Sequence, residues 1–119
     1  MKIMVVDDSQ RMRKKIREIV VEEVPDVNTV FECENGAEAV ECYEKHLPDW
    51  VLMDIGMGKM NGFTASEKIL RHHPGAKIMI VTQYDDPEYR EAARKIGISA
   101  YVLKEKLMDI PRILTSMLY

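Results

Sequence analysis

The feature that most constrains the fold is the regular alternation of short apolar runs with longer amphipathic segments. The short runs suit β-strands, and the longer segments place apolar residues at the three- and four-residue spacing of a helix. Four of the five short runs are nearly continuously apolar, as in parallel strands that helices cover on both faces. The predicted strands are residues 2–6, 29–33, 49–53, 77–82 and 100–104, and the predicted helices are residues 9–24, 35–46, 63–73, 86–97 and 109–119. The sequence therefore predicts an α/β fold with a doubly wound, five-stranded parallel sheet.

Residues that favour helix ends stand where the amphipathic segments begin and stop. Ser9 and Asn35 can each accept a hydrogen bond from the first turn of the helix that follows. At the fourth helix, Asp86 is expected to cap the start and Gly97 to end the helix. The basic run "RMRKKIR" at 11–17 is expected to form a solvated helix face, or alternatively to help dock an acidic partner.

Length and composition exclude several classes of protein. A chain of 119 residues suits one domain, which we expect to span 1–119. The net charge of −3 offers no basic surface for nucleic acid, and no apolar run approaches the roughly 20 residues that span a bilayer. The N-terminus lacks the pattern of a signal peptide, and Cys33 and Cys42 lack the spacing of a metal site. We therefore expect a cytoplasmic protein with reduced thiols that binds neither membranes nor nucleic acid directly.

Polar side chains stand at the carboxyl ends of four of the five predicted strands. Asp7 and Asp8 come after the first strand and Asp54 after the third, while Thr82 and Lys104 end the fourth and fifth. Each side chain alone could be a helix cap, a turn residue or a solvated group. In a doubly wound sheet, however, the functional crevice lies beyond the carboxyl ends of the strands. We therefore expect these five side chains to meet at one edge of the sheet.

The chemistry of this set indicates a phosphate site. Three neighbouring carboxylates repel one another and raise one another's pKa values, which a hard divalent cation relieves. Mg²⁺ suits such a site, because it binds one or two carboxylates and completes its shell with water and phosphate oxygens. Lys104 supplies a positive charge and Thr82 a hydroxyl donor. The combination describes a site of phosphoryl transfer.

Over residues 2–119 the chain resembles response-regulator receiver domains of two-component signalling, the CheY-like superfamily. The motifs that carry the resemblance are "VVDDS" at 5–9, "CENGAEAV" at 33–40, "DWVLMDIGMGKMNG" at 49–62, "IMIVT" at 78–82 and "GISAYVLK" at 97–104. The resemblance implies a (βα)5, flavodoxin-like fold with strand order 2-1-3-4-5. "YVLKE" at 101–105 resembles receivers that precede a helix-turn-helix output domain.

The resemblance also implies a role for each carboxylate. Asp54 would be the phosphoacceptor, which takes a phosphoryl group from a sensor histidine kinase. Asp8 would ligate Mg²⁺ directly and Asp7 largely through water, with Asp54 and the backbone carbonyl of Gly56 as further ligands. The domain would catalyse only its own phosphorylation and dephosphorylation, and would not be an enzyme that acts on a metabolite.

Two further roles concern the phosphorylated state. Thr82 and Lys104 would each contact a phosphoryl oxygen, and Tyr101 would be the switch aromatic that turns inward when Thr82 moves. The surface formed by the fourth helix, fifth strand and fifth helix would then change its affinity for an output partner or output domain. Whether phosphorylation also produces a homodimer stays open at this point.

The sequence departs from the family's usual pattern at two places near the site. Gly58 replaces a usual proline and predicts a more mobile loop after the phosphoacceptor. Gln83 replaces a small residue, and with Tyr84 it is expected to slow the access of water and small phosphodonors. Of the other loop glycines, Gly56 is expected to leave room at the site, and Gly62 to let the chain enter the third helix.

Two alternatives to the signalling switch belong to other classes. A phosphatase-type hydrolase could use Asp54 as its nucleophile, but such an enzyme usually carries a second carboxylate two residues later, where this chain has Gly56. A pure interaction module that no longer takes phosphate is disfavoured by the complete set of acids, Thr82 and Lys104. The switch is therefore the leading hypothesis.

Overall fold

The computed structural model describes residues 1–56 and 60–116 and confirms the predicted fold class. The five strands form one parallel sheet in the order β2-β1-β3-β4-β5. The strands are β1 (Lys2–Val6), β2 (Thr29–Cys33), β3 (Trp50–Met53), β4 (Ile78–Thr82) and β5 (Ala100–Leu103). The helices are α1 (Gln10–Glu23), α2 (Gly36–His46), α3 (Gly62–His72), α4 (Pro87–Ile96) and α5 (Asp109–Ser116), with a short 3₁₀ helix, η1 (Lys104–Lys106), after β5.

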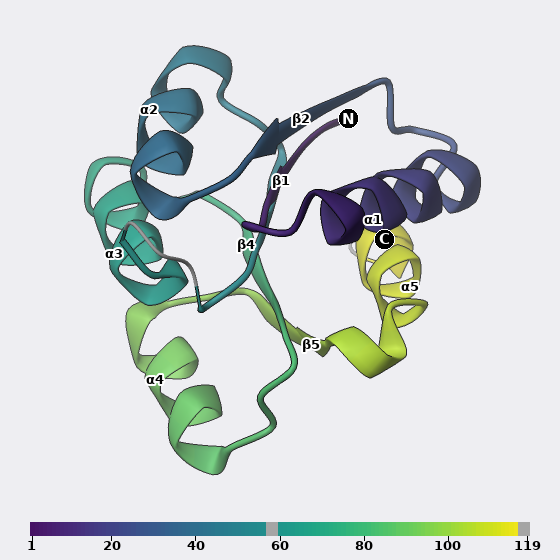
Figure 1. Cartoon of the computed structure of the whole chain (residues 1–119). Helices are drawn as coiled ribbons and strands as arrows, with labels where there is room; N and C mark the ends of the chain where they lie inside the picture. The colour runs from purple at the N-terminus through teal and green to yellow at the C-terminus, as the bar shows by residue number, and fades with distance from the viewer. Residues whose placement is uncertain (57–59, 117–119) are drawn as a thin grey trace.

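Helices cover both faces of the sheet, as the apolar character of the strands requires. Figure 1 shows α2, α3 and α4 on one side and α1 and α5 on the other. Because successive side chains of a strand point to opposite faces, β1 contributes Met4 and Val6 to one core and Ile3 and Val5 to the other. In the described part of the chain, no helix combines the length and the apolar character needed to cross a membrane.

The predicted helix caps are confirmed in most cases. The side chains of Ser9 and Asn35 accept hydrogen bonds from the first turns of α1 and α2, at 3.2 and 2.9 Å. Gly97 ends α4 in the left-handed conformation, with φ of 100°. Asp86 is the N-cap residue of α4, as predicted, but its side chain makes no capping hydrogen bond. Its backbone carbonyl instead accepts from the amide of Tyr89 at 3.0 Å.

The fifth strand is shorter than predicted. It ends at Leu103, and Lys104 begins η1. The reason lies in the neighbouring strand, because Leu103 is aligned with Thr82, the last residue of β4. Beyond this pair β4 offers no further backbone partner, so the chain turns. Lys104 is thereby placed on a turn above the sheet edge rather than within the sheet.

Gly62 is required by a close approach of two backbones. A β-carbon built on Gly62 would overlap the carbonyl oxygen of Asp54 and lie 2.9 Å from the carbonyl carbon. The amide of Gly62 also donates to the carbonyl of Ile55 at 3.0 Å. The start of α3 thus rests directly on the backbone of Asp54. Gly62 does begin α3, as expected, but the space beside Asp54 is what demands glycine.

We predict that Gly62→Ala lowers the free energy of unfolding by about 1–3 kcal/mol, because the added methyl group must displace α3 or Asp54. Gly75→Ala is the matched control, since a β-carbon there meets no atom of the described residues within 4 Å. The control should change the free energy of unfolding by less than about 1 kcal/mol. Urea unfolding followed by circular dichroism measures both, and equal effects of the two substitutions would contradict the role of the contact.

Candidate functional site

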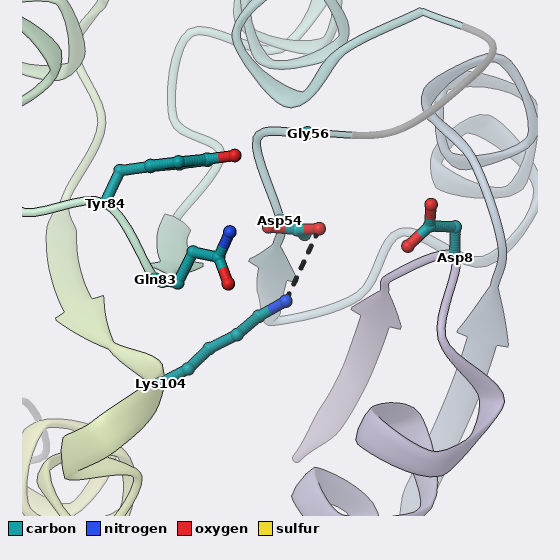
Figure 2. Close-up of a pocket in the computed structure, with 6 residues that line it drawn as sticks. All are labelled: Asp8, Asp54, Gly56, Gln83, Tyr84 and Lys104. Atoms are coloured by element: carbon teal, nitrogen blue, oxygen red, sulfur yellow. Dashed lines mark ion pairs between the residues drawn. The ribbon is translucent and has the colours of Figure 1, made fainter.

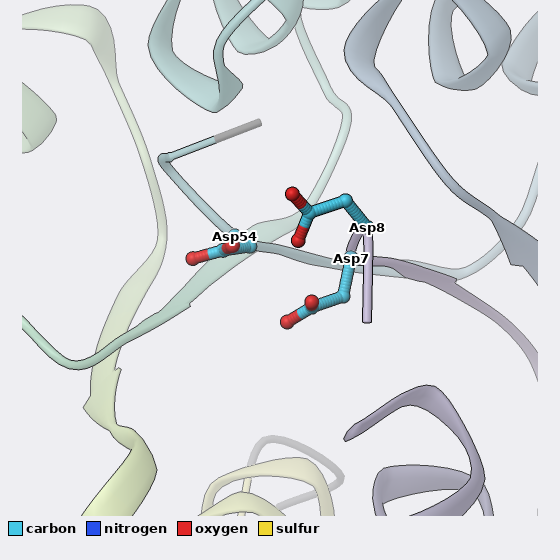
Figure 3. A group of neighbouring side chains, drawn as sticks. All are labelled: Asp7, Asp8 and Asp54. Atoms are coloured by element: carbon cyan, nitrogen blue, oxygen red, sulfur yellow. The ribbon is translucent and has the colours of Figure 1, made fainter. Parts of the chain in front are cut away.

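Backbone pairing between β1 and β3 brings the acidic residues together. Val6 is aligned with Met53, and the amide of Asp54 donates to the carbonyl of Val6 at 2.9 Å. Asp7 and Asp54, the next residues of the two strands, therefore emerge side by side. One carboxylate oxygen each from Asp7, Asp8 and Asp54 lies within 4.8 Å of the others (Figure 3). The predicted acidic cluster is thus assembled by strand register.

The three acids differ in their exposure to solvent. Asp7 and Asp54 are buried, with 1% and 6% of their surface exposed, whereas Asp8 is exposed. Each buried carboxylate accepts a main-chain hydrogen bond, from Ser9 to Asp7 and from Ile55 to Asp54, both at 2.9 Å. These bonds hold one oxygen of each carboxylate in place. The second oxygens remain available to other partners.

Lys104 is the main countercharge of the buried acids. Its Nζ lies 2.9 Å from Oδ2 of Asp7. The same Nζ lies 3.5 Å from Oδ2 of Asp54, the ion pair drawn in Figure 2. Burial raises the pKa of Asp54 above its usual value. The positive charge of Lys104 lowers this pKa and the negative charge of Asp7 raises it, and the net result is a raised pKa. For Lys104, burial favours a lower pKa, but the bonds and charges of Asp7 and Asp54 outweigh it and raise the pKa. Lys104 is therefore a fully charged ammonium at neutral pH.

A small polar pocket opens above Asp54. It has a volume of about 190 Å³ and is lined by Asp8, Asp54, Gly56, Gln83, Tyr84 and Lys104 (Figure 2). Such a volume accommodates several water molecules, and hence a phosphoryl group with a hydrated ion. Gln83 and Tyr84 thus line the same pocket as Asp54, and their predicted effect on access stays a prediction.

The donor atoms around this pocket fit a hard divalent cation. All three charged donors are carboxylates, and they approach closely enough to share one ion. Gly56 lines the same pocket, where its backbone carbonyl could complete the oxygen set. The expectation that Gly56 leaves room at the site stays a prediction. Among the described residues, a β-carbon there would meet only the Tyr84 ring, at an ordinary contact distance of 3.9 Å, so no described protein atom requires glycine here. The loop position Gly58 lies outside the described residues.

Thr82 and Tyr101 are linked through the backbone of Tyr84. Thr82 is fully buried, and its Oγ1 accepts from the amide of Tyr84 at 3.3 Å. The hydroxyl of Tyr101 donates to the carbonyl of Tyr84 at 2.6 Å, and the Arg90 guanidinium lies over the Tyr101 ring at 4.6 Å. Thr82 thus reaches the sheet edge with the other site residues but does not line the pocket. Tyr101 is half-buried and bonded to the loop that Thr82 begins.

Sequence reasoning missed two arginines of α1 that belong to the surroundings of the site. Arg13 and Arg17 fall in the run predicted to be a solvated face, yet both bind the carboxylate of Glu32. Arg13 also donates from Nη1 to the backbone carbonyl of Asp7 at 2.8 Å. Their spacing of one helical turn on the face toward β2 was the available signal. The prediction of a solvated face is therefore wrong for Arg13, whose side chain is 14% exposed, whereas the Arg17 side chain is 43% exposed although it is paired.

Comparison with known proteins places these features in a family. The family model of the response regulator receiver domain matches residues 3–116. The chain is 37% identical over 107 residues to the transcriptional regulatory protein DegU of Brevibacillus brevis, covering 90% of this chain and 45% of that protein. It is 39% identical over 102 residues to the chemotaxis protein CheY of Halobacterium salinarum, covering 86% of this chain and 82% of that protein.

A solved structure agrees with the fold. A DNA-binding response regulator of the LuxR family from Staphylococcus aureus superposes with a TM-score of 0.89 at 26% identity, covering 97% of this chain and 96% of that chain. The chain spans about half the length of DegU, so the output of any longer protein lies beyond this comparison. The sheet order, the acidic cluster and the family match agree with one another. The chain belongs to the response-regulator receiver domains, a family of signalling domains.

Proposed function

We propose that this chain is a phosphorylation-activated switch that accepts a phosphoryl group on Asp54 from a sensor histidine kinase, with Mg²⁺ as cofactor. One observation carries the proposal: Asp54 lies at the base of a polar pocket, between two further carboxylates and the ammonium of Lys104. A nucleophile, a cation site and an anion-binding charge thus converge on one small volume, in a chain of the receiver family.

The site residues divide the chemistry among themselves. An oxygen of the Asp54 carboxylate attacks phosphorus, and the bond from phosphorus to the kinase's histidine nitrogen breaks as the new bond forms. Lys104, already charged, pairs with a phosphoryl oxygen. Asp7, Asp8, Asp54 and the carbonyl of Gly56 would hold the cation. When bound, Mg²⁺ supplies charge neutralisation for the transferring group. The hydrogen bond from Ile55 keeps the Asp54 carboxylate oriented during the attack.

The switch depends on hydrogen bonds to Tyr84. A phosphoryl group that binds the Thr82 hydroxyl competes with the present contact between Thr82 and the Tyr84 amide. The carbonyl of the same residue accepts the Tyr101 hydroxyl, so movement of this loop also moves Tyr101. Because Arg90 of α4 lies against the Tyr101 ring, the change extends to the α4–β5–α5 surface. This surface would then bind or release an output partner.

The partners and the location follow from the same reasoning. The proposed donor is a sensor histidine kinase and the proposed recipient an output domain or protein, both meeting the receiver in the cytoplasm. The relatives are a transcriptional regulatory protein and a chemotaxis protein, so their similarity favours neither kind of output. Gly56 in place of a second acid still disfavours the hydrolase alternative.

We predict that incubation with Mg²⁺ and a small acyl phosphate adds the mass of one phosphoryl group, and that Asp54→Asn abolishes the gain, because the nucleophilic oxygen is lost. Asp109→Asn on α5, outside the pocket lining, is the control and should be modified like the wild type. Intact-protein mass spectrometry measures the modification. Continuous release of phosphate without accumulation would support the hydrolase, and no modification would support an interaction module.

We predict that Mg²⁺ raises the thermal unfolding midpoint, since binding to the folded state alone stabilises it by about 2.7 kcal/mol at one hundred times the dissociation constant. Asp8→Asn should remove most of this gain. Because Asp8 is exposed, the substitution should leave the midpoint without metal nearly unchanged. Scanning fluorimetry at matched ionic strength is the measurement. A midpoint gain in Asp8→Asn equal to that of the wild type would contradict the assignment of Asp8 as a ligand.

We predict that Gln83→Ala and Tyr84→Ala each speed the loss of the phosphoryl group from Asp54 several-fold, because both side chains line the pocket above Asp54 and their removal opens it to water. Tyr84→Phe keeps the ring and should dephosphorylate at the wild-type rate. The decay of the phosphorylated protein, followed by mass spectrometry, gives the rates. Unchanged rates in both alanine variants would show that these side chains do not limit access.

A further inference from the structure

We propose that Arg13 is a positioning residue that orients the Asp7–Asp8 turn, and through it the carboxylate of Asp8, for binding of the divalent cation. The inference rests on the proposed function, because it concerns the same cation. It assigns to α1 and β2 a role in the site, although neither element contributes a side chain to the pocket lining.

The guanidinium of Arg13 bridges two elements. Its Nε donates to Oε1 of Glu32 on β2 at 3.0 Å, and its Nη1 donates to the backbone carbonyl of Asp7 at 2.8 Å. Only 14% of the Arg13 side chain is exposed, so the group is held rather than free in solvent. Both contacts are charge-assisted hydrogen bonds of good length. Arg13 therefore ties the carbonyl of Asp7 to β2.

Glu32 is itself held from a second side. Arg17, one turn further along α1, donates from Nε to Oε2 of Glu32 at 2.8 Å and from Nη2 to the carbonyl of Val30 at 3.1 Å. Each oxygen of Glu32 thus binds one arginine. Burial favours a higher pKa for Glu32, but the two guanidinium groups outweigh it and lower the pKa, which keeps the carboxylate charged. The paired charges give Arg13 a fixed partner.

These bonds fix the direction in which the chain leaves β1. The amide of Asp7 donates to the carbonyl of Cys33 at 3.1 Å, while its carbonyl accepts from Arg13. The carbonyl of Asp7 and the amide of Asp8 belong to one planar peptide group, so fixing the first fixes the second. Both backbone groups of Asp7 are therefore bound, one directly to β2 and one through Arg13.

Among the described residues, Asp8 is held only through this backbone. Across residues 1–56 and 60–116, the Asp8 carboxylate takes part in no hydrogen bond and no ion pair with another described residue. Asp7 and Asp54, by contrast, each accept a main-chain hydrogen bond and contact Lys104. Within the described part of the chain, the Asp7–Asp8 peptide therefore sets the point from which the Asp8 side chain projects toward the other two acids.

The role requires the shape of arginine and not only its charge. A guanidinium presents donors in several directions in one plane, whereas an ammonium is a compact point charge on a flexible stem. Lysine at this position would keep the charge but lose the fixed bridge between Glu32 and Asp7. An effect of charge alone on the acids is further reduced because Glu32 neutralises Arg13.

The test compares Arg13→Met, Arg13→Lys and Arg17→Met. Arg17→Met removes the other arginine that binds Glu32 but no contact with Asp7, so it is the matched control. We expect both Arg13 variants to weaken Mg²⁺ binding about 10- to 100-fold, as is common for residues that orient metal ligands, and Arg17→Met to change it less than about threefold. Isothermal titration calorimetry gives the affinities, and urea unfolding should show similar midpoint losses for Arg13→Met and Arg17→Met.

A second measurement needs no metal. The Ser9 amide, which donates to Asp7 in the same turn, should exchange with solvent faster in Arg13→Met and unchanged in Arg17→Met, as read by NMR. Equal loss of Mg²⁺ affinity in Arg13→Met and Arg17→Met, or wild-type affinity in Arg13→Lys, would overturn the positioning role. If the wild type and Arg13→Met bind Mg²⁺ equally well, the positioning role of Arg13 is overturned and the proposed function is not. A wild type that binds no Mg²⁺ would overturn the proposed function and, with it, the role of Arg13 toward the cation.

Discussion

The arrangement of the site depends on one interaction, the insertion of the Lys104 ammonium between the carboxylates of Asp7 and Asp54. Two buried carboxylates this close would repel one another and would each lose hydration. The ammonium of Lys104 opposes both costs, although the pKa of Asp54 stays raised, and the two acids in turn keep the ammonium charged although burial alone would favour its neutral form. The partly buried ammonium and the two buried acids therefore stabilise one another.

This interaction explains why the strand order matters for the site. Asp7 and Asp54 leave adjacent strands, whereas Lys104 comes from β5, which β4 separates from β3. Its side chain must therefore cross the end of β4. It can do so because β4 stops at Thr82 and because η1 lifts Lys104 off the end of β5. The shortening of β5 is thus part of the site's construction. In the proposed function, a cation at the acids would replace Lys104 as their countercharge and leave its ammonium for a phosphoryl oxygen.

The fold and the polar set could be predicted because both depend on local pattern. The alternation of apolar runs fixes the elements, and the rule that crevices form beyond strand ends brings Asp7, Asp8 and Asp54 together. The features that the sequence did not predict correctly depend instead on contacts between distant segments. The need for Gly62 arises from the backbone of Asp54, and the end of β5 arises from the length of β4. Periodicity carries no information about such contacts.

Dependence on contacts between distant segments also explains why the sequence did not predict the role of Arg13. Along the chain it belongs to a basic run with Lys14, Lys15 and Arg17, and its spacing of one helical turn from Arg17 does not by itself identify a partner. Only the packing of α1 beside β2 shows that Arg13 faces Glu32 and the carbonyl of Asp7. The acids of the site are then supported in two different ways. Lys104 balances the charge of Asp7 and Asp54, while Arg13 fixes the peptide from which Asp8 projects. Since Asp8 is exposed and its carboxylate has no hydrogen bond or ion pair with another described residue, an unchanged charge on Lys104 could not compensate for a turn that has lost its orientation.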